Sequence, residues 1–290
     1  MELDSLIRWL FYKRKKEIIL EEDLRKLDKY RDWTDIKIQI ERIKKIPRKD
    51  KVRFVVFGDT RGDFRVGRDI ITHSVNHEPD FYLVTGDIVR RGRVEEYIAH
   101  HLRMVRLAGD IPVIPVPGNH EEGPDKSYTA FKRLYGTDRF VFECGYARFI
   151  GFNNNSMFSF TTEELDFLDT TLRNSNVNFK FVVMHKPPKF LKVYSDKEKG
   201  RGVRWRVKKF HNLMNYHKVT EVFMGHVHGF VTMVIDGVRY TISAGGGARL
   251  EDMLGNENKM HHYLLYEVSN DSIRRIRFDW DDGRWQEVLF

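Results

Sequence analysis

The chain has one cysteine, Cys144, among its 290 residues. A single cysteine excludes an internal disulfide and a metal cage built from several thiolates. The sequence also lacks a run of about 20 apolar residues, the length that a helix needs to cross a bilayer. Its N-terminus has neither the basic start nor the small-residue cleavage site of a signal peptide. These absences predict a cytoplasmic protein without a transmembrane segment.

Neither an internal repeat nor a low-complexity tract is evident, and 41% of the residues are apolar. That content is ample for one large hydrophobic core. The net charge of +8 is unevenly distributed, because residues 1–51 carry 16 basic and 11 acidic side chains, and residues 186–209 carry 10 basic and two acidic ones. The distribution is therefore more informative than the overall charge.

Five apolar runs, rich in β-branched and aromatic residues, are each followed at once by a short polar motif. Continuous runs of this kind are typical of buried strands in an α/β sheet. Ligands gather beyond the carboxyl ends of such strands, so distant motifs can meet there. The runs are Phe54–Phe57, Phe81–Val84, Val113–Val116, Phe181–Met184 and Val222–Met224. The motifs are Gly58–Gly62, Gly86–Asp87, Gly118–Glu121, His185 and Gly225–His228.

These motifs would bring together two carboxylates, one amide oxygen and four imidazoles. Aspartate and histidine are good ligands for manganese, iron, cobalt, nickel or zinc. A bridging carboxylate can hold two cations about 3.5–4 Å apart, and Asp87 is the natural bridge because it ends a central strand. One such motif alone is usually a turn, and His185 alone is usually a core histidine. All five together predict a two-metal site.

From Val52 to Tyr263 the order and spacing of the motifs resemble the calcineurin-like metallophosphoesterase superfamily. Its pattern is Asp-x-His, Gly-Asp, Gly-Asn-His-(Asp/Glu), His and Gly-His-x-His. Residues 162–172, 180–188, 237–240 and 245–248 are similar to the branch that includes purple acid phosphatases and their bacterial relatives.

The resemblance implies a role for each motif. One metal would be held by Asp59, Asp87 and His228. The second metal would be held by Asp87, Asn119, His185 and His226. A hydroxide bridging the metals would attack the phosphate ester, and His120 would act as the general acid at the leaving group.

The chain departs from the family pattern at Arg61, where the family has the histidine of Asp-x-His. A guanidinium is always protonated and cannot ligate a metal. The first metal site therefore keeps three protein ligands, and its occupancy stays open. Arg61 either contacts a substrate phosphate or pairs with an acid such as Asp63.

A second departure concerns residues 90 and 91. Purple acid phosphatases have a tyrosine ligand at the position of Arg90, so we expect no tyrosinate here. Serine/threonine phosphatases of the superfamily have Asp-Arg where this chain has Arg90-Arg91. By position Arg91 would keep the contact with phosphate, whereas the aspartate partner of His120 is missing. Asp63 or Glu121 is the expected substitute.

The basic segment 186–209 follows directly on His185, so we expect it to line one wall of the site. Lysine and arginine beside two metals would attract an anionic substrate. Tyr194 and Trp205 would equally suit stacking on nucleic-acid bases. A solvated loop is the third interpretation that stays open.

Residues 1–47 lie outside the resemblance and predict a helical extension to a catalytic domain at 48–290. Leu3, Leu6, Ile7, Leu10 and Phe11 recur at the spacing of one helical face. That face would pack on its own domain or a second subunit, or it would lie on a membrane surface together with the basic residues 13–16. Trp33, Ile36, Ile40 and Ile43 fit a helix, although Ile36, Ile38 and Ile40 equally fit a strand.

After residue 229 the pattern is β, with runs at 230–235, 238–243, 262–268 and 273–278 and a hairpin signal at Asp236-Gly237. Helical patterns occupy 92–107, 162–172 and 205–216. The expected fold is α/β, a four-layer α/β/β/α sandwich of two mixed sheets flanked by helices.

The sequence thus predicts a metal-dependent phosphomonoesterase or phosphodiesterase with Asp59, Asp87, Asn119, His185, His226 and His228 as metal ligands. His120, Arg91 and Arg61 would act on the substrate, a phosphorylated small molecule or nucleotide. The cofactors would be two divalent transition metals, with manganese favoured. Two alternatives stay open: a nuclease or nucleic-acid-binding phosphodiesterase, and a degenerate scaffold without activity. The oligomeric state is not encoded in the motifs, and a homo-oligomer stays open.

Overall fold

The computed structural model describes residues 19–47, 50–156, 158–193, 202–281 and 283–290. The apolar face at residues 3–11, the basic residues 13–16 and Tyr194 lie outside the described residues. Among the described residues, no helix is both long and apolar enough to span a membrane.

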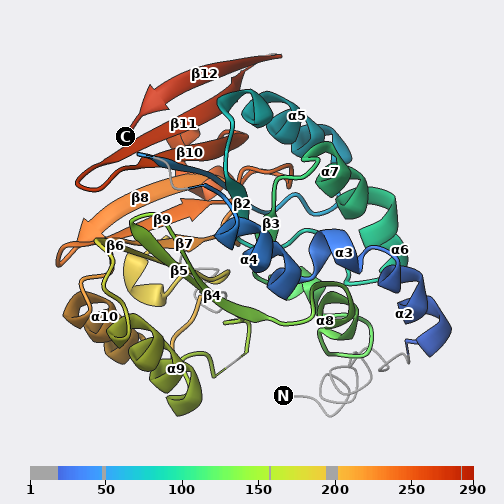
Figure 1. Cartoon of the computed structure of the whole chain (residues 1–290), viewed down its shortest axis with the longest axis horizontal. Coiled ribbons are helices and arrows are strands. Elements are labelled where there is room, and N and C mark those ends of the chain that lie inside the picture. Colours follow the sequence, from blue (N-terminus) through green and yellow to red (C-terminus); the bar gives the residue numbers. More distant parts are fainter. Residues whose placement is uncertain (1–18, 48–49, 157, 194–201, 282) are drawn as a thin grey trace, which may run out of the picture.

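Two six-stranded sheets form the centre of the molecule (Figure 1). The strand order is β12-β11-β10-β1-β2-β3 in the first sheet and β4-β5-β6-β7-β9-β8 in the second. The strands of the first sheet are β1 Val52–Phe57, β2 Phe81–Val84, β3 Val113–Pro115, β10 His262–Val268, β11 Ile273–Asp281 and β12 Arg284–Leu289. Those of the second are β4 Arg139–Cys144, β5 Ala147–Phe152, β6 Phe179–Val183, β7 Glu221–Met224, β8 Phe230–Ile235 and β9 Val238–Ser243.

Both sheets are mixed, and each contains one set of adjacent parallel strands. In the first sheet β1, β2 and β3 run parallel, and in the second sheet β5, β6, β7 and β9 do so. The strands that precede the five polar motifs all belong to these two parallel sets. Since parallel strands end at one edge of a sheet, each sheet presents its motifs at a single edge.

The alternation of side chains along the second sheet sorts them into two cores. Phe149, Phe181 and Phe223 join the core between the sheets. The neighbouring residues Ile150, Val182 and Val222 point the other way, into a core shared with two helices. Phe54 of β1 packs edge-on against Phe149, with ring centroids 5.0 Å apart. The sheets are therefore held face to face largely by aromatic contacts.

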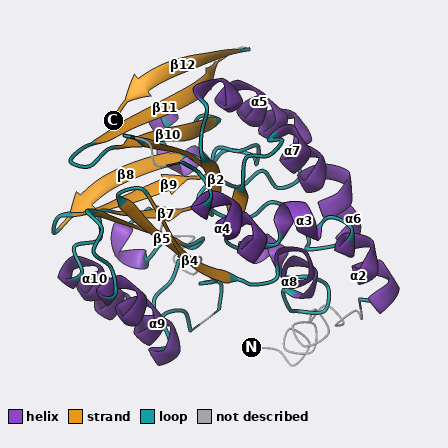
Figure 2. Ribbon diagram, in the orientation of Figure 1, coloured by secondary structure: helices purple, strands orange, loops and turns teal. Residues whose placement is uncertain are grey.

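Helices cover the outer faces of both sheets (Figure 2). Ile70 of α5 and Met104 of α7 pack into the core of the first sheet. Leu168 of α9 and Phe210 of α10 pack against the second sheet. The helices are α2 Glu21–Asp28, α3 Arg31–Thr34, α4 Ile36–Lys44, α5 Phe64–Ser74, α6 Val94–Glu96, α7 Leu102–Leu107, α8 Thr129–Tyr135, α9 Thr162–Arg173 and α10 Val207–Tyr216. The predicted α/β/β/α sandwich is confirmed.

Several local predictions are now resolved. Residues 36–44 form a helix, because Ile36 and Ile43 bury one helical face in the main core. The helix predicted at 92–107 begins at Val94 and contains a π-helical turn, Tyr97–His101. At the predicted hairpin Ile235 pairs with Val238, and both Asp236 and Gly237 have positive φ.

The helices before β1 pack closely on α8. Arg133 of α8 forms an ion pair with Asp28 of α2, and the Thr34 hydroxyl donates to the Leu134 carbonyl at 2.9 Å. Leu24 and Leu27 are buried in the main core. The division into an extension at 1–47 and a catalytic domain at 48–290 stays a prediction.

A buried carboxylate connects the two sheets. Glu221 of β7 is fully buried and accepts hydrogen bonds from Thr241 at 2.5 Å and from Tyr266 of the first sheet at 2.6 Å. Arg275 of β11 donates to its other oxygen at 3.0 Å. These three partners come from β9, β10 and β11, so neighbouring strands compensate the buried charge of Glu221.

We expect Glu221→Ala to lower the free energy of unfolding by about 3–5 kcal/mol, because it leaves the Arg275 charge without its partner in a largely buried place. Urea denaturation monitored by circular dichroism measures the loss. The matched control is Glu287→Ala on β12, which removes a half-exposed partner of Arg274 and should cost no more than about 1 kcal/mol. Equal losses for the two variants would contradict the role given to Glu221.

Candidate metal centre

The strand-end motifs of both sheets meet in one place. Asp59 follows β1, Asp87 follows β2 and Asn119 follows β3, while His185 and His226 follow β6 and β7 of the second sheet. Asp59, Asp87 and His226 have φ of 59°, 53° and 73°. Non-glycine residues rarely adopt this left-handed backbone, which is strained and clusters at functional sites. The strain here coincides with three of the predicted ligands.

Two groups of potential metal ligands share one residue. Asp87, His185 and His226 form one group, and Asp59, Asp87 and His228 form the other, with the ligand atoms of each group within 4.8 Å of one another. All of these side chains are buried. The common residue is Asp87, in the position that a bridging carboxylate would take.

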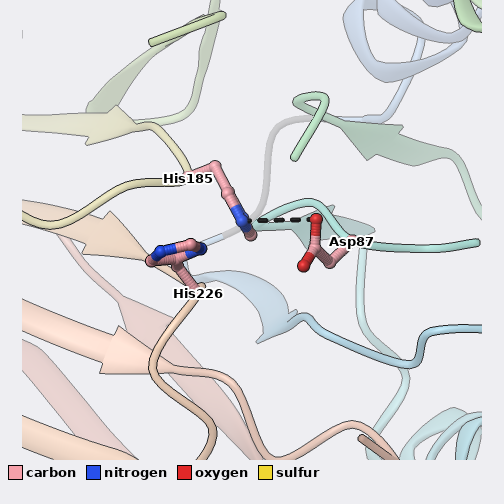
Figure 3. A group of neighbouring side chains, drawn as sticks. All are labelled: Asp87, His185 and His226. Atoms are coloured by element: carbon pink, nitrogen blue, oxygen red, sulfur yellow. Dashed lines mark ion pairs between the residues drawn. The ribbon is translucent and has the colours of Figure 1, made fainter. Parts of the chain in front are cut away.

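Short contacts link the members of these groups. His185 Nε2 lies 3.3 Å from Asp87 Oδ1 (Figure 3) and 3.2 Å from Asn119 Oδ1. His228 Nε2 lies 3.5 Å from Asp59 Oδ1. The structure thus brings together all six residues predicted as ligands, and their assignment to particular ions stays a prediction.

Two imidazoles are oriented by backbone carbonyls. His185 Nδ1 lies 2.8 Å from the Thr85 carbonyl, and His228 Nδ1 lies 2.7 Å from the Arg249 carbonyl. A carbonyl can only accept, so each Nδ1 carries the proton and each Nε2 keeps its lone pair. The lone pairs point toward the carboxylates, as in histidine ligands fixed by a second hydrogen bond.

The protonation of the histidines suits metal binding. Burial lowers the pKa of His185 to about 4, and burial likewise lowers the pKa of His228. Both rings are therefore neutral at pH 7 and able to ligate. Burial, reinforced by the Asp87 carboxylate, raises the pKa of Asp59 well above its usual range. A cation between the Asp59 and Asp87 carboxylates would offset the cost of burying their negative charges.

Glycines leave the space that the ligands occupy. A Cβ on Gly118 would lie 2.2 Å from Asp87 Oδ1, and a Cβ on Gly225 would lie 2.5 Å from Asp59 Oδ2. A Cβ on Gly86 would lie 2.8 Å from His185 Nδ1. With two carboxylates, one amide and three imidazoles around it, this cradle fits two divalent transition metals.

His120 lies at the edge of the ligand groups, but its partner is not the predicted one. Its Nδ1 lies 2.6 Å from the Arg90 carbonyl. Asp63 instead caps α5 through the Arg65 and Val66 amides, and Glu121 is fully buried and engaged elsewhere. The expectation that one of these acids orients His120 was wrong, because a backbone carbonyl already takes that position.

Arg61 contacts His120 and is not engaged by Asp63. Arg61 Nη2 lies 3.1 Å from His120 Nδ1, whereas the acid Asp63 lies 4.0 Å from Arg65. Arg90 Nε donates to the Arg61 carbonyl at 3.0 Å. Because Nδ1 already donates to the Arg90 carbonyl, the Arg61 guanidinium lies beside the imidazole without a hydrogen bond to it, and the Arg61 side chain lines a cavity.

That cavity has a volume of about 810 Å³ and is bordered by Asn119 and His120. The Arg61 and Arg91 side chains, both predicted to act on substrate, also line it. The described part of the basic segment 186–209 is absent from its lining. The basic wall expected from that segment is thus supplied by other loops among the described residues.

Two positioning roles were not predicted from the sequence: Glu121 was expected to orient His120 but binds backbone amides, and Asn154 was not singled out. The Glu121 carboxylate accepts from the amides of Asp87 at 2.7 Å, Val89 at 3.0 Å and Gly118 at 2.6 Å. Burial, with the Asp87 carboxylate, raises the pKa of Glu121 to about 8. Asn154 Oδ1 accepts from the His185 and Lys186 amides. The run of three asparagines after β5 was the available signal for Asn154.

Two mixed sheets with a carboxylate-bridged pair of ligand groups at their strand ends define a dinuclear metallohydrolase. The chain belongs to the calcineurin-like phosphoesterase family, whose family model matches residues 52–230. It is accordingly a phosphoesterase of the metal-dependent kind, with a site suited to two metals. No curated protein matches the sequence.

Solved structures support the fold at low sequence identity. The purple acid phosphatase PPD1 from yellow lupin has a TM-score of 0.67 at 15% identity. The aligned region includes 82% of this chain and 53% of the lupin enzyme. The chain thus spans about half the length of that enzyme. A dimetal phosphatase from Danio rerio has a TM-score of 0.59 at 15% identity, with 82% and 99% covered. GAP50, the anchor in the inner membrane complex of Plasmodium, has a TM-score of 0.61 at 14% identity, with 83% and 89% covered.

We expect Gly225→Ala to release metal, because the added Cβ would displace Asp59 Oδ2. Elemental analysis after gel filtration should show at least one ion fewer per chain than in the unsubstituted protein. Gly109→Ala is the control, since its Cβ meets nothing within 4 Å and its positive φ adds strain alone. Unchanged metal content in folded Gly225→Ala would refute the proposed placement of Asp59 in the site.

Proposed function

We propose that the chain hydrolyses phosphate monoesters or diesters at the centre formed by its two ligand groups. The observation that carries this proposal is the sharing of Asp87 by both groups next to a cavity bordered by His120 and two arginines. Manganese is the favoured metal among those that suit carboxylate and imidazole ligands, and a cytoplasmic location accompanies the proposal.

Two divalent cations, when bound, supply Lewis acidity that lowers the pKa of water and neutralises phosphoryl oxygens. The chain positions these cations with Asp59, Asp87 and His228 on one side and Asp87, Asn119, His185 and His226 on the other. Asp87 is fixed for this role because its own amide is bound by Glu121 and its Oδ1 accepts from the His120 amide at 2.9 Å.

His120 supplies the proton for the leaving group. Its Nδ1 donates to the Arg90 carbonyl, and its Nε2 lies 3.9 Å from Asp87 Oδ2, so this nitrogen faces the reacting centre. An oxygen from water forms a bond to phosphorus while the bond from phosphorus to the ester oxygen breaks. The proton from Nε2 passes to that ester oxygen, which leaves as an alcohol.

Arg61 and Arg91 bind the non-bridging phosphoryl oxygens. A guanidinium offers paired donors that match a phosphate, and it stays charged throughout the reaction. Arg61 is held next to His120, and Arg91 lines the same cavity. Arg61, which stands where the family has a metal-binding histidine, would thereby stabilise the negative charge of the phosphoryl oxygens by direct contact.

Metal content and ester hydrolysis, measured together, test the proposal. We expect about two metals per chain after loading with Mn²⁺, together with hydrolysis of p-nitrophenyl phosphate or its bis-ester. The ratio of the two rates separates a phosphatase from a phosphodiesterase, including the nuclease alternative. Asp87→Asn should abolish turnover and bind less metal.

One metal or none, with no turnover of either ester, would favour the scaffold alternative. Arg61 in place of a ligand is the sequence feature behind that alternative. GAP50, the anchor in the inner membrane complex of Plasmodium, has a similar fold.

We expect His120→Ala to reduce turnover of an alkyl phosphate by about 10²–10⁴-fold, the usual contribution of a general acid. The loss on p-nitrophenyl phosphate should be much smaller, because nitrophenolate leaves without protonation. Steady-state kinetics on both esters, with His77→Ala as a control, gives the comparison. Equal losses on the two esters would remove His120 from the general-acid role.

A further inference from the structure

The cavity in front of the metal centre carries more positive charge than one phosphate requires. Among the described residues that line it, six are basic and two, Asp63 and Glu122, are acidic. The basic residues are Arg61, Arg90, Arg91, Arg93, Lys126 and Arg249. They come from four separate segments of the chain, so the excess is produced by the fold.

Acidic side chains compensate only part of this positive charge within the described residues. Arg249 lies 3.9 Å from Asp252, and Arg61 is held beside His120. The side chains of Arg91 and Lys126, in contrast, make no hydrogen bond or ion pair with any part of the chain that the structure describes. Like charges concentrated without counter-charges destabilise a surface unless an anion binds there.

The loops that carry Arg91 and Lys126 are in direct contact. A Cβ on Gly92 would lie 2.9 Å from Gly123 Cα, so the two backbones meet where no side chain fits. The second loop is closed by the Lys126 amide, which donates to the Gly123 carbonyl at 3.0 Å. Asp125 fixes the end of that loop by accepting from Ser127 and Thr129. Arg91 and Lys126 thus extend from two loops whose backbones meet, and both side chains line the same cavity.

The cavity is also much larger than one phosphoryl group. Its volume of about 810 Å³ falls in the range of about 300–1,000 Å³ that is typical of sites for whole small molecules. In the proposed reaction Arg61 and Arg91 bind the phosphate that is cleaved. Lys126 is then available for a second anionic group on the same molecule.

The described lining contains no phenylalanine, tyrosine or tryptophan. Proteins that bind nucleotide bases without reading their sequence usually stack them on aromatic rings. A cavity of guanidinium and ammonium groups without such rings suits a substrate whose remainder is aliphatic or consists of further phosphate.

We propose that the substrate carries at least two phosphate groups and no aromatic base, with the second phosphate bound by Lys126 next to Arg91. This inference rests on the proposed function, which it deepens by assigning the substrate class. Water attacks one phosphorus, which is released as inorganic phosphate, and the oxygen of the broken bond takes the proton from His120 and stays with the product. That oxygen becomes an alcohol in a polyol bisphosphate and part of the remaining phosphate in a polyphosphate. A polyol bisphosphate and a short polyphosphate chain share this chemistry.

Binding tests the inference independently of turnover. Isothermal titration of the Mn²⁺-loaded protein should show butane-1,4-diphosphonate binding at least tenfold more tightly than butylphosphonate. Lys126→Gln should reduce that ratio at least fivefold. The matched control Lys209→Gln, an exposed lysine on α10, should leave the ratio unchanged. Equal affinities for the two ligands, or an unaltered ratio in Lys126→Gln, would overturn the inference.

Turnover then separates the two sources of the second phosphate. A higher kcat/KM for fructose 1,6-bisphosphate than for fructose 6-phosphate identifies a polyol bisphosphate, and a higher value for tripolyphosphate than for p-nitrophenyl phosphate identifies a polyphosphate. Hydrolysis of p-nitrophenyl phosphate without either preference would overturn the inference and leave the proposed function standing. No hydrolysis of any of these compounds, nor of bis-p-nitrophenyl phosphate, would refute the proposed function, while the titration still decides whether a polyanion binds.

A base-bearing substrate is tested in the same titration. Adenosine 5′-monophosphate should bind no more tightly than ribose 5-phosphate. A tenfold preference for the adenosine compound would overturn the exclusion of an aromatic base.

Discussion

Two aspartate carboxylates that are removed from water at the junction of two sheets set the main constraint on this molecule. Asp59 and Asp87 are almost fully buried, and the neighbouring imidazoles of His185 and His228 are neutral at pH 7. Buried like charges are costly unless a cation lies between them. The left-handed backbone at Asp59, Asp87 and His226 and the glycines around them make sense only as the means of holding these groups in one place.

Glu121 extends that constraint from the ligands to the residues around them. By accepting from the amides of Asp87, Val89 and Gly118, one carboxylate joins the turn after β2 to the turn after β3. The first turn supplies the shared ligand, and the second supplies Asn119 and His120. Neither turn can move without the other, so the distance from the predicted general acid to the metals is set by the backbone.

The sequence predicted the sandwich and the six clustered ligand positions because both depend on local signals. Apolar runs such as Phe181–Met184 identify strands wherever both faces are buried. β4 was missed, since Arg139, Glu143 and other partly exposed residues interrupt its apolar pattern. β5, α5 and α8 were missed with it, and β12 has exposed residues on most of its length.

Contacts between distant segments were beyond sequence reasoning. The Arg90 carbonyl takes the place of the acid that we expected to orient His120. Every residue has a backbone carbonyl, so the sequence does not indicate which one will take such a role. The basic wall was expected from residues 186–209, but Lys126 and Arg249 supply part of it. Those two residues lie 123 positions apart and are brought to one cavity only by the folded chain.

The residues around the metal ligands and those at the opening of the cavity differ in how freely they can be substituted. Gly86, Gly118 and Gly225 have no room for a methyl group, so a lineage that alters them loses the centre itself. Arg249 at the opening has no such restriction, since its side chain is 92% exposed. A protein built in this way can exchange one substrate for another through single surface substitutions, each of which leaves the fold and the chemistry intact.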